Sequence, residues 1–234
     1  VWSMSNPGPI AAHPADVAAA YMAMAGVDAN DPRTLNQPHP VAPDASRRDL
    51  RSITIGYMPA WFEHADSEIV MHCRNMLHYF RAAGADVREI NIAGLEAARV
   101  AHTILITSEM IQALDNELTL HGHLLADETR LSLAISREFT ALDITHAQQT
   151  RTTFTRSLRE AFAQVDLIAT PTFGLCAPAI TPAHIPHGLS DLSSTFEIMR
   201  YAFAANLTGV PSISMPAGFS KAGLPIGFQF MARP

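Results

Sequence analysis

The chain of 234 residues has very little lysine and very little cysteine. Lys221 is its only lysine, so arginine supplies the rest of the positive side-chain charge. The two cysteines, Cys73 and Cys176, are too few for a disulfide framework, so we expect buried thiols and a reducing, cytoplasmic location. No apolar run is long enough to span a membrane, and no signal-peptide pattern opens the chain.

Excess positive charge and glycine-rich phosphate-binding motifs are also missing. The formal net charge of −6 argues against a nucleic-acid partner. Neither G-x-G-x-x-G nor G-x-x-x-x-G-K occurs, which argues against a nucleotide cofactor. The composition, with 48% hydrophobic and 16% charged residues, is typical of a globular protein with a sizeable core.

Hydrophobic periodicity predicts alternating strands and helices over much of the chain. Strands at Ile53–Tyr57 and Val87–Ile92 flank a helix over Asp66–Ala83, so they form a β–α–β unit and indicate an α/β fold. A Pro-rich connector covers residues 28–51. Four further helices are expected, with a break at Gly122: Pro14–Ala25, Leu95–Leu114, Asp127–Ser136 and Asp143–Val165.

Three β-rich runs stand out in the last third of the chain: Asp166–Thr170, Pro211–Met215 and Ile226–Ala232. A helical segment separates the first two, which predicts a right-handed crossover between neighbouring parallel strands. A short turn separates the last two, which predicts an antiparallel hairpin. The sheet is therefore expected to be mainly parallel or mixed.

The helix of this crossover is predicted to begin at Ser194, because Ser194 and Glu197 have the spacing of a capping box. Gly209 and Pro211 are predicted to end it. One apolar stripe follows the helix: Phe196, Met199, Phe203 and Leu207.

The ordered motifs of this region resemble those of the amidase signature hydrolases. The chain contains D-L-I-A-T-P-T, then A-N-L-T-G-V-P-S-I-S-M-P-A-G, then G-L-P-I-G-F-Q. Near the N-terminus, the run Asn6-Pro7-Gly8-Pro9-Ile10 resembles the family segment just after the catalytic serine. Met199-Arg200 before Ala204-Ala205-Asn206-Leu207 resembles the fatty-acid-amide-hydrolase-like branch. The resemblance implies that residues 1–234 are one incomplete amidase domain, part of a large mixed sheet flanked by helices.

The resemblance also implies a catalytic mechanism. In this family a serine is activated through a second serine by a buried neutral lysine, and no metal or other cofactor is needed. Lys221 lies in an expected turn, and an exposed lysine keeps its proton at neutral pH and is a poor base. The family's glycine–serine loop is absent. The catalytic residues are therefore expected before Val1, and this segment alone is predicted to be inactive.

Other polar residues have simpler structural interpretations. Ser212 and Ser214 alternate along a predicted strand and are expected to be sheet hydroxyls. His102, on a mostly apolar helix, is expected to be a hydrogen-bonded helix histidine rather than a general base. A metal site is disfavoured for two histidine pairs without converging cysteine or carboxylate ligands: His121 with His123, and His184 with His187.

We expect this segment to contribute a substrate pocket. Thr172 follows a predicted strand at its carboxyl end, where α/β sheets usually bind ligands. In the amidotransferase branch of the family, an aspartate seven residues before the equivalent of Asn206 helps to hold a polar substrate. Met199 stands there instead, which favours an apolar acyl or aryl group. Met199 and Phe203 are predicted to bind substrate, and the alternative is that both fill the core.

The predicted function is hydrolysis of the C–N bond of a carboxylic amide, such as a fatty-acid amide or another hydrophobic amide. One alternative is a non-catalytic binding or scaffold protein with the same fold. Another is an A-type amidotransferase subunit that delivers ammonia to a partner. The expected partners are the small-molecule amide and the remainder of the amidase domain, and a homodimer is left open.

Overall fold

A five-stranded mixed sheet organises the computed structural model, which describes residues 1–43, 49–182 and 191–233. β1 pairs in parallel with β2 and β3, and β5 pairs antiparallel with β3 and β4. The strand order is β2-β1-β3-β5-β4. The predicted α/β class, mixed sheet and C-terminal hairpin are therefore confirmed. The strands are β1 (Thr54–Tyr57), β2 (Asp86–Glu89), β3 (Leu167–Pro171), β4 (Ser212–Phe219) and β5 (Pro225–Ala232).

The predicted neighbouring parallel pair in the last third of the chain is wrong in one respect. β3 and β4 run in the same direction, but β5 lies between them. The reason is burial, because β5 carries an apolar run in which Phe228, Phe230 and Met231 are all buried. Because β5 lies between β3 and β4, it has hydrogen-bonding partners at both of its edges, and its apolar side chains are covered on both faces of the sheet.

The first β–α–β unit forms as predicted. Helix α3 (Ser67–Ala82) connects the parallel strands β1 and β2, and it buries Ile69, Cys73 and Leu77. Gly84 follows this helix with φ of 102°, a conformation that favours glycine. The short helix α2 (Pro59–Phe62), directly after β1, was not predicted.

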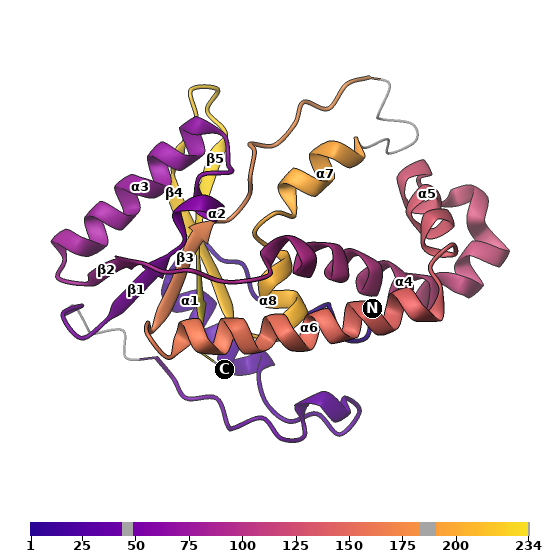
Figure 1. The fold of residues 1–234 in the computed structure, drawn as a ribbon, viewed down its shortest axis with the longest axis horizontal. Helices are drawn as coiled ribbons and strands as arrows, with labels where there is room; N and C mark the ends of the chain where they lie inside the picture. Colours follow the sequence, from indigo (N-terminus) through magenta and orange to yellow (C-terminus); the bar gives the residue numbers. More distant parts are fainter. Residues whose placement is uncertain (44–48, 183–190, 234) are drawn as a thin grey trace. The chain divides into compact units, whose positions relative to one another are not determined.

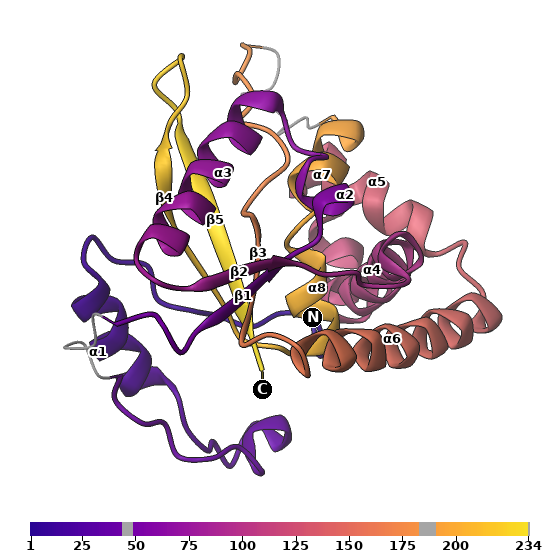
Figure 2. The ribbon, with the colours of Figure 1, turned by 60° about the vertical axis from the view of Figure 1, so that its left-hand side comes forward.

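Helices cover both faces of the sheet. Figures 1 and 2 show α3 on one face and α4, α6 and α8 on the other. α4 is seven residues longer than predicted, but the predicted break at Gly122 is present and α5 has the predicted bounds. No helix in the described ranges is both long and apolar enough to cross a membrane. The bounds are α4 (Leu95–His121), η2 (Gly122–Leu124), α5 (Asp127–Ser136), α6 (Ala141–Phe162) and α8 (Phe203–Thr208).

The predicted crossover helix is two helices, α7 (Leu192–Ile198) and α8, joined by a turn at residues 199–202. The predicted capping box is wrong, since the side chain of Asp191 caps α7 by accepting from the Ser193 N–H. Glu197 instead pairs with Arg200. The predicted C-cap is confirmed, because Gly209 has φ of 78° and its N–H donates to the Ala205 carbonyl.

Residues 6–49 form a separate compact unit. It contains helix α1 (Pro14–Met24) and the short 3-10 helix η1 (Pro32–Thr34), which the Asp31 side chain caps. Apart from η1, the described residues of the predicted Pro-rich connector form neither helix nor strand. None of the described residues of this unit is buried.

Candidate substrate site at the carboxyl end of strand β3

A buried glutamine joins the end of β3 to the turn between α7 and α8. Gln229 lies opposite Thr170 in the sheet. Its Nε2 donates to the Thr170 Oγ1 at 3.1 Å and to the Tyr201 carbonyl at 3.3 Å. Only 1% of Thr170 and 6% of Gln229 are exposed, so these bonds form in a dry environment where an unpaired partner would be costly. The turn is therefore fixed against the carboxyl end of β3.

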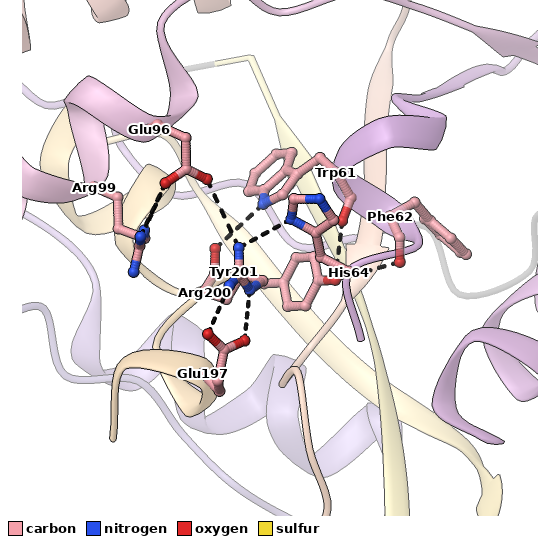
Figure 3. A network of polar contacts seen from close by, with 8 residues as sticks. All are labelled: Trp61, Phe62, His64, Glu96, Arg99, Glu197, Arg200 and Tyr201. Atoms are coloured by element: carbon pink, nitrogen blue, oxygen red, sulfur yellow. Dashed lines mark hydrogen bonds and ion pairs between the residues drawn. The ribbon is translucent and has the colours of Figure 1, made fainter. Parts of the chain in front are cut away.

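Helix α2 holds the same turn from another side, as Figure 3 shows. Trp61 Nε1 donates to the Arg200 carbonyl at 3.2 Å. The hydroxyl of the fully buried Tyr201 lies 3.0 Å from the Trp61 carbonyl and 3.3 Å from the Phe62 carbonyl, and burial raises its pKa. The backbone carbonyls of residues 200 and 201 thus accept hydrogen bonds from the side chains of Trp61 and Gln229, respectively. These bonds compete with the backbone bonds that a continuous helix would make through the same carbonyls.

Arg200 is the centre of a charged network around the turn. Its Nε and one terminal nitrogen donate to the two carboxylate oxygens of Glu197 at 2.8 and 2.6 Å. Its other terminal nitrogen lies 3.0 Å from His64 Nδ1 and 3.7 Å from a Glu96 oxygen. The hydrogen bonds between Arg200 and Glu197 lower the pKa of Glu197 and raise that of Arg200. The network also includes Arg99 of α4, whose guanidinium pairs with Glu96 at 2.9 Å.

The segment that leaves β3 passes close to the C-terminal end of α7. The Gly174 carbonyl accepts the N–H of Asp66, the N-cap of α3, at 2.8 Å. A Cβ placed on Gly174 would lie 2.6 Å from the carbonyl oxygen of Glu197. Only a glycine therefore fits at this position without a backbone shift.

The three residues predicted to bind substrate lie in different surroundings. Thr172 is half-buried just beyond β3, and its hydroxyl donates to the Ser214 Oγ at 3.1 Å. Met199 is half-buried at the C-cap of α7, and it is the first residue of the turn at 199–202. Phe203 is only 2% exposed, and its ring centre lies 6.0 Å from those of Trp61 and Phe154. Phe203 therefore lies in the core, as predicted by the alternative in which it fills the core rather than binds substrate.

The lysine and the histidine pair that the structure describes lie at separate places on the surface. Lys221 is exposed between β4 and β5, and its backbone N–H donates to Glu68. His121 and His123 are not buried, whereas His184 and His187 lie outside the described residues. Within the part of the chain that the structure describes, no three histidine, cysteine or acidic side chains gather in a way that could hold a metal ion.

The surroundings of His102 differ from those that the sequence predicts. The residue is 4% exposed, and its Nε2 has no hydrogen-bond partner among the described residues, so the predicted hydrogen-bonded histidine is wrong for this nitrogen. The ring lies 6.2 Å from that of Phe203. Burial, with a smaller effect of the nearby Arg151 charge, lowers the pKa of His102 to about 4. His102 is therefore neutral at physiological pH, and its surroundings are those of a core residue rather than of a general base.

The tethering residues were missed by the sequence analysis: Trp61, Arg200, Tyr201 and Gln229. Gln229 gave a usable signal, since it is the one polar side chain between Ile226 and Ala232. A polar residue in an otherwise buried strand needs a partner. The partners of Trp61 and Tyr201 come from distant parts of the chain, so local sequence spacing does not reveal them. Arg200 pairs with Glu197 three residues away, and this spacing could have indicated the ion pair.

A protein-family model described as Amidase matches residues 2–234. The chain belongs to the amidase family. It is 37% identical over 234 residues to a fatty acid amide hydrolase of Medicago truncatula, with 97% of this chain but only 39% of that protein covered. It is 25% identical to the A subunit of the glutamyl-tRNA(Gln) amidotransferase of Myxococcus xanthus, of which it covers 52%. The amidase chain therefore spans about 39% to 52% of the length of these relatives.

Solved structures show the same amidase fold. A bacterial aryl acylamidase of the amidase signature family superposes with a TM-score of 0.71 at 23% identity. The match covers 93% of this chain and 47% of that one. The predicted family and fold class are therefore confirmed for this chain.

Proposed function

We propose that this chain is part of an amidase that hydrolyses the C–N bond of a hydrophobic carboxylic amide. The family match and the similarity to plant fatty acid amide hydrolases support this proposal. The observation that carries it is Met199, an apolar and half-buried residue on a tethered turn beside the carboxyl end of β3. A thioether at this place favours an apolar acyl or aryl group.

In this proposal the chain binds and orients the substrate. Thr172 offers a hydroxyl beside the strand end, Met199 contacts the acyl group, and Phe203 supports that wall from the core side. The serine nucleophile, the second serine and the lysine base lie in the remainder of the amidase domain, as the family resemblance implies. No metal or other cofactor is required. The cytoplasmic location and the homodimer remain predictions.

The substitution Met199→Asp tests the acyl-binding role. In the complete protein that contains this chain, we expect kcat/KM for a long-chain amide, relative to a short polar amide, to fall by about 10-fold or more, because a carboxylate is costly in an apolar pocket. Met71→Asp is the matched control, since Met71 is 50% exposed on α3 and its replacement should leave the ratio unchanged. An unchanged ratio in Met199→Asp would remove Met199 from the site.

A covalent probe tests where the nucleophile lies. Residues 1–234 alone should not react with a fluorophosphonate serine probe, whereas the complete protein should be labelled at a serine outside this range. Mass spectrometry of the labelled peptides identifies the serine. A labelled serine within residues 1–234 contradicts the proposal, and an unlabelled complete protein favours the non-catalytic scaffold instead.

The amidotransferase alternative has a separate test. The similarity to amidotransferase A subunits supports it, but Met199 stands where that branch is expected to have an aspartate. Glutaminase activity that appears only with a partner subunit would favour this alternative. Hydrolysis of hydrophobic amides by the protein without a partner would favour the amidase.

A further inference from the structure

The turn at residues 199–202 is fixed by bonds from several elements, whereas Phe196 gives α7 little apolar anchoring. Phe196, a large apolar residue of α7, is 43% exposed and lies against Arg99 rather than inside the core. The close approach of α7 to the segment that leaves β3 is polar backbone, at Gly174 and the Glu197 carbonyl. The placement of α7 and of Met199 at its end therefore depends strongly on polar contacts.

Arg200 makes several of these polar contacts with a single side chain. It binds Glu197 within α7, His64 after α2 and Glu96 at the start of α4. Its backbone carbonyl accepts from Trp61. A planar guanidinium suits this arrangement, because it presents several N–H groups in fixed directions, which a lysine ammonium does not. Since its side chain is only 13% exposed, salt screens its pairing with Glu197 less than it screens a surface ion pair.

We propose that Arg200 is a positioning residue for the substrate site, which holds Met199 in place and thereby sets the preference for long acyl groups. Arg200 acts through α7 and the turn, and its side chain is occupied by protein partners rather than by substrate. This inference rests on the proposed function, because it needs Met199 to contact the acyl group.

A specific kinetic pattern follows. Without the Arg200 side chain, the end of α7 loses its contacts with His64 and Glu96. The backbone of the turn is still held by Trp61 and Gln229. Met199 then samples several positions, and the binding of the acyl group weakens. Because this binding is the same in the ground state and the transition state, KM for long-chain amides should rise while kcat changes little.

Three variants of the complete protein test this pattern. We expect Arg200→Gln to raise KM for a long-chain amide about 5- to 10-fold and to leave KM for a short amide unchanged. Arg200→Lys should raise KM less than Arg200→Gln does, because lysine keeps the positive charge but lacks the planar guanidinium. Arg130→Gln is the matched control, since Arg130 is a half-exposed arginine of α5 whose partner is Asp127. An equal loss for long and short amides would overturn the proposal.

A double-mutant cycle tests whether Arg200 acts through Met199. In the background of Met199→Ala, the substitution Arg200→Gln should cause no further rise in KM for the long-chain amide. A full additional rise would show that Arg200 acts by another route and would overturn the proposal.

A spectroscopic measurement separates this inference from the proposed function. With 5-fluorotryptophan incorporated, the ¹⁹F signal of Trp61, assigned with Trp61→Phe, should shift and broaden in Arg200→Gln but not in the control Arg130→Gln. If the complete protein hydrolyses no amide, the proposed function fails and this signal alone decides the positioning role. An unchanged Trp61 signal in Arg200→Gln overturns that role.

Discussion

His102 is a polar side chain whose burial is not fully compensated. Its Nε2 lacks a hydrogen-bond partner among the described residues, and its ring lies beside that of Phe203. Burying such a group is costly and is more costly still when it carries a proton. The neutral ring is therefore tolerated in the core, and the charged ring is not.

This position predicts a loss of stability in acid. The pKa of His102 is about 4 in the folded protein, and that of an unfolded histidine is about 6.5. As pH falls, the unfolded state binds the proton first, so the stabilisation is complete above pH 6.5 and is lost between about pH 6.5 and 4. The loss amounts to about 3 kcal/mol.

Urea unfolding between pH 7.5 and 4.5 measures this effect. His102→Leu should have a smaller decrease in the free energy of unfolding across this range than the wild type, because it removes the titrating group. His121→Gln is the control, since His121 is exposed at the end of α4. Equal pH dependence in the wild type and His102→Leu would contradict the prediction.

At the scale of single elements, the position of α7 is coupled to the strand exit by Gly174. A Cβ there would meet the backbone carbonyl oxygen of Glu197 at 2.6 Å, so Gly174→Ala must move one of the two segments. We expect a loss of about 1–3 kcal/mol in stability, as is usual for overpacking. Gly122→Ala is the control, because its Cβ would make ordinary contact with Leu118 at 3.5 Å.

Thermal unfolding of both variants measures the difference. Gly174→Ala should unfold at a lower temperature than the wild type, and Gly122→Ala should not. A Gly174→Ala protein as stable as the wild type would show that the strand exit and α7 separate without cost.

The sequence predicted those elements whose signals are local. α5 has the predicted bounds because a glycine break precedes it and its apolar spacing is regular. The crossover helix was predicted as one piece because its apolar stripe continues from Phe196 to Leu207. The turn that interrupts it is bound by Trp61 and Gln229, which lie far away in the sequence and donate to two of its carbonyls. The spacing of apolar residues along one helix does not indicate partners that lie far away in the sequence.

The candidate site was predictable to the same extent. Thr172 and Met199 were predicted because a strand end and a family motif mark them, and their role in substrate binding stays a prediction. Phe203 was predicted from the same apolar stripe, and the structure places it inside the aromatic core. Most of the polar bonds that fix the site were missed because they act across the fold, as those of Tyr201 with Trp61 and Phe62 do.

At the scale of the whole molecule, the chain divides into two units of unequal packing. Residues 6–49 include no buried residue in their described part, whereas the unit of residues 1–5 and 50–234 contains the hydrophobic core. Segments with few buried contacts open at low free-energy cost. The two units are therefore expected to differ in resistance to proteases.

Limited thermolysin digestion of residues 1–234 tests this expectation. The first cuts should fall before exposed apolar residues of the smaller unit, such as Ile10, Tyr21 and Leu35. Mass spectrometry of the early fragments locates the cuts. First cuts within α3 or α6 would show that the core unit is the weaker one.

The single lysine of the chain also has a practical use. Lys221 is exposed at the connection between β4 and β5, and its backbone is tied to Glu68 of α3. An amine-reactive dye would therefore attach to one known side chain of these 234 residues, apart from the terminal amine. Such a dye would give the hairpin tip an optical marker without the introduction of a new cysteine.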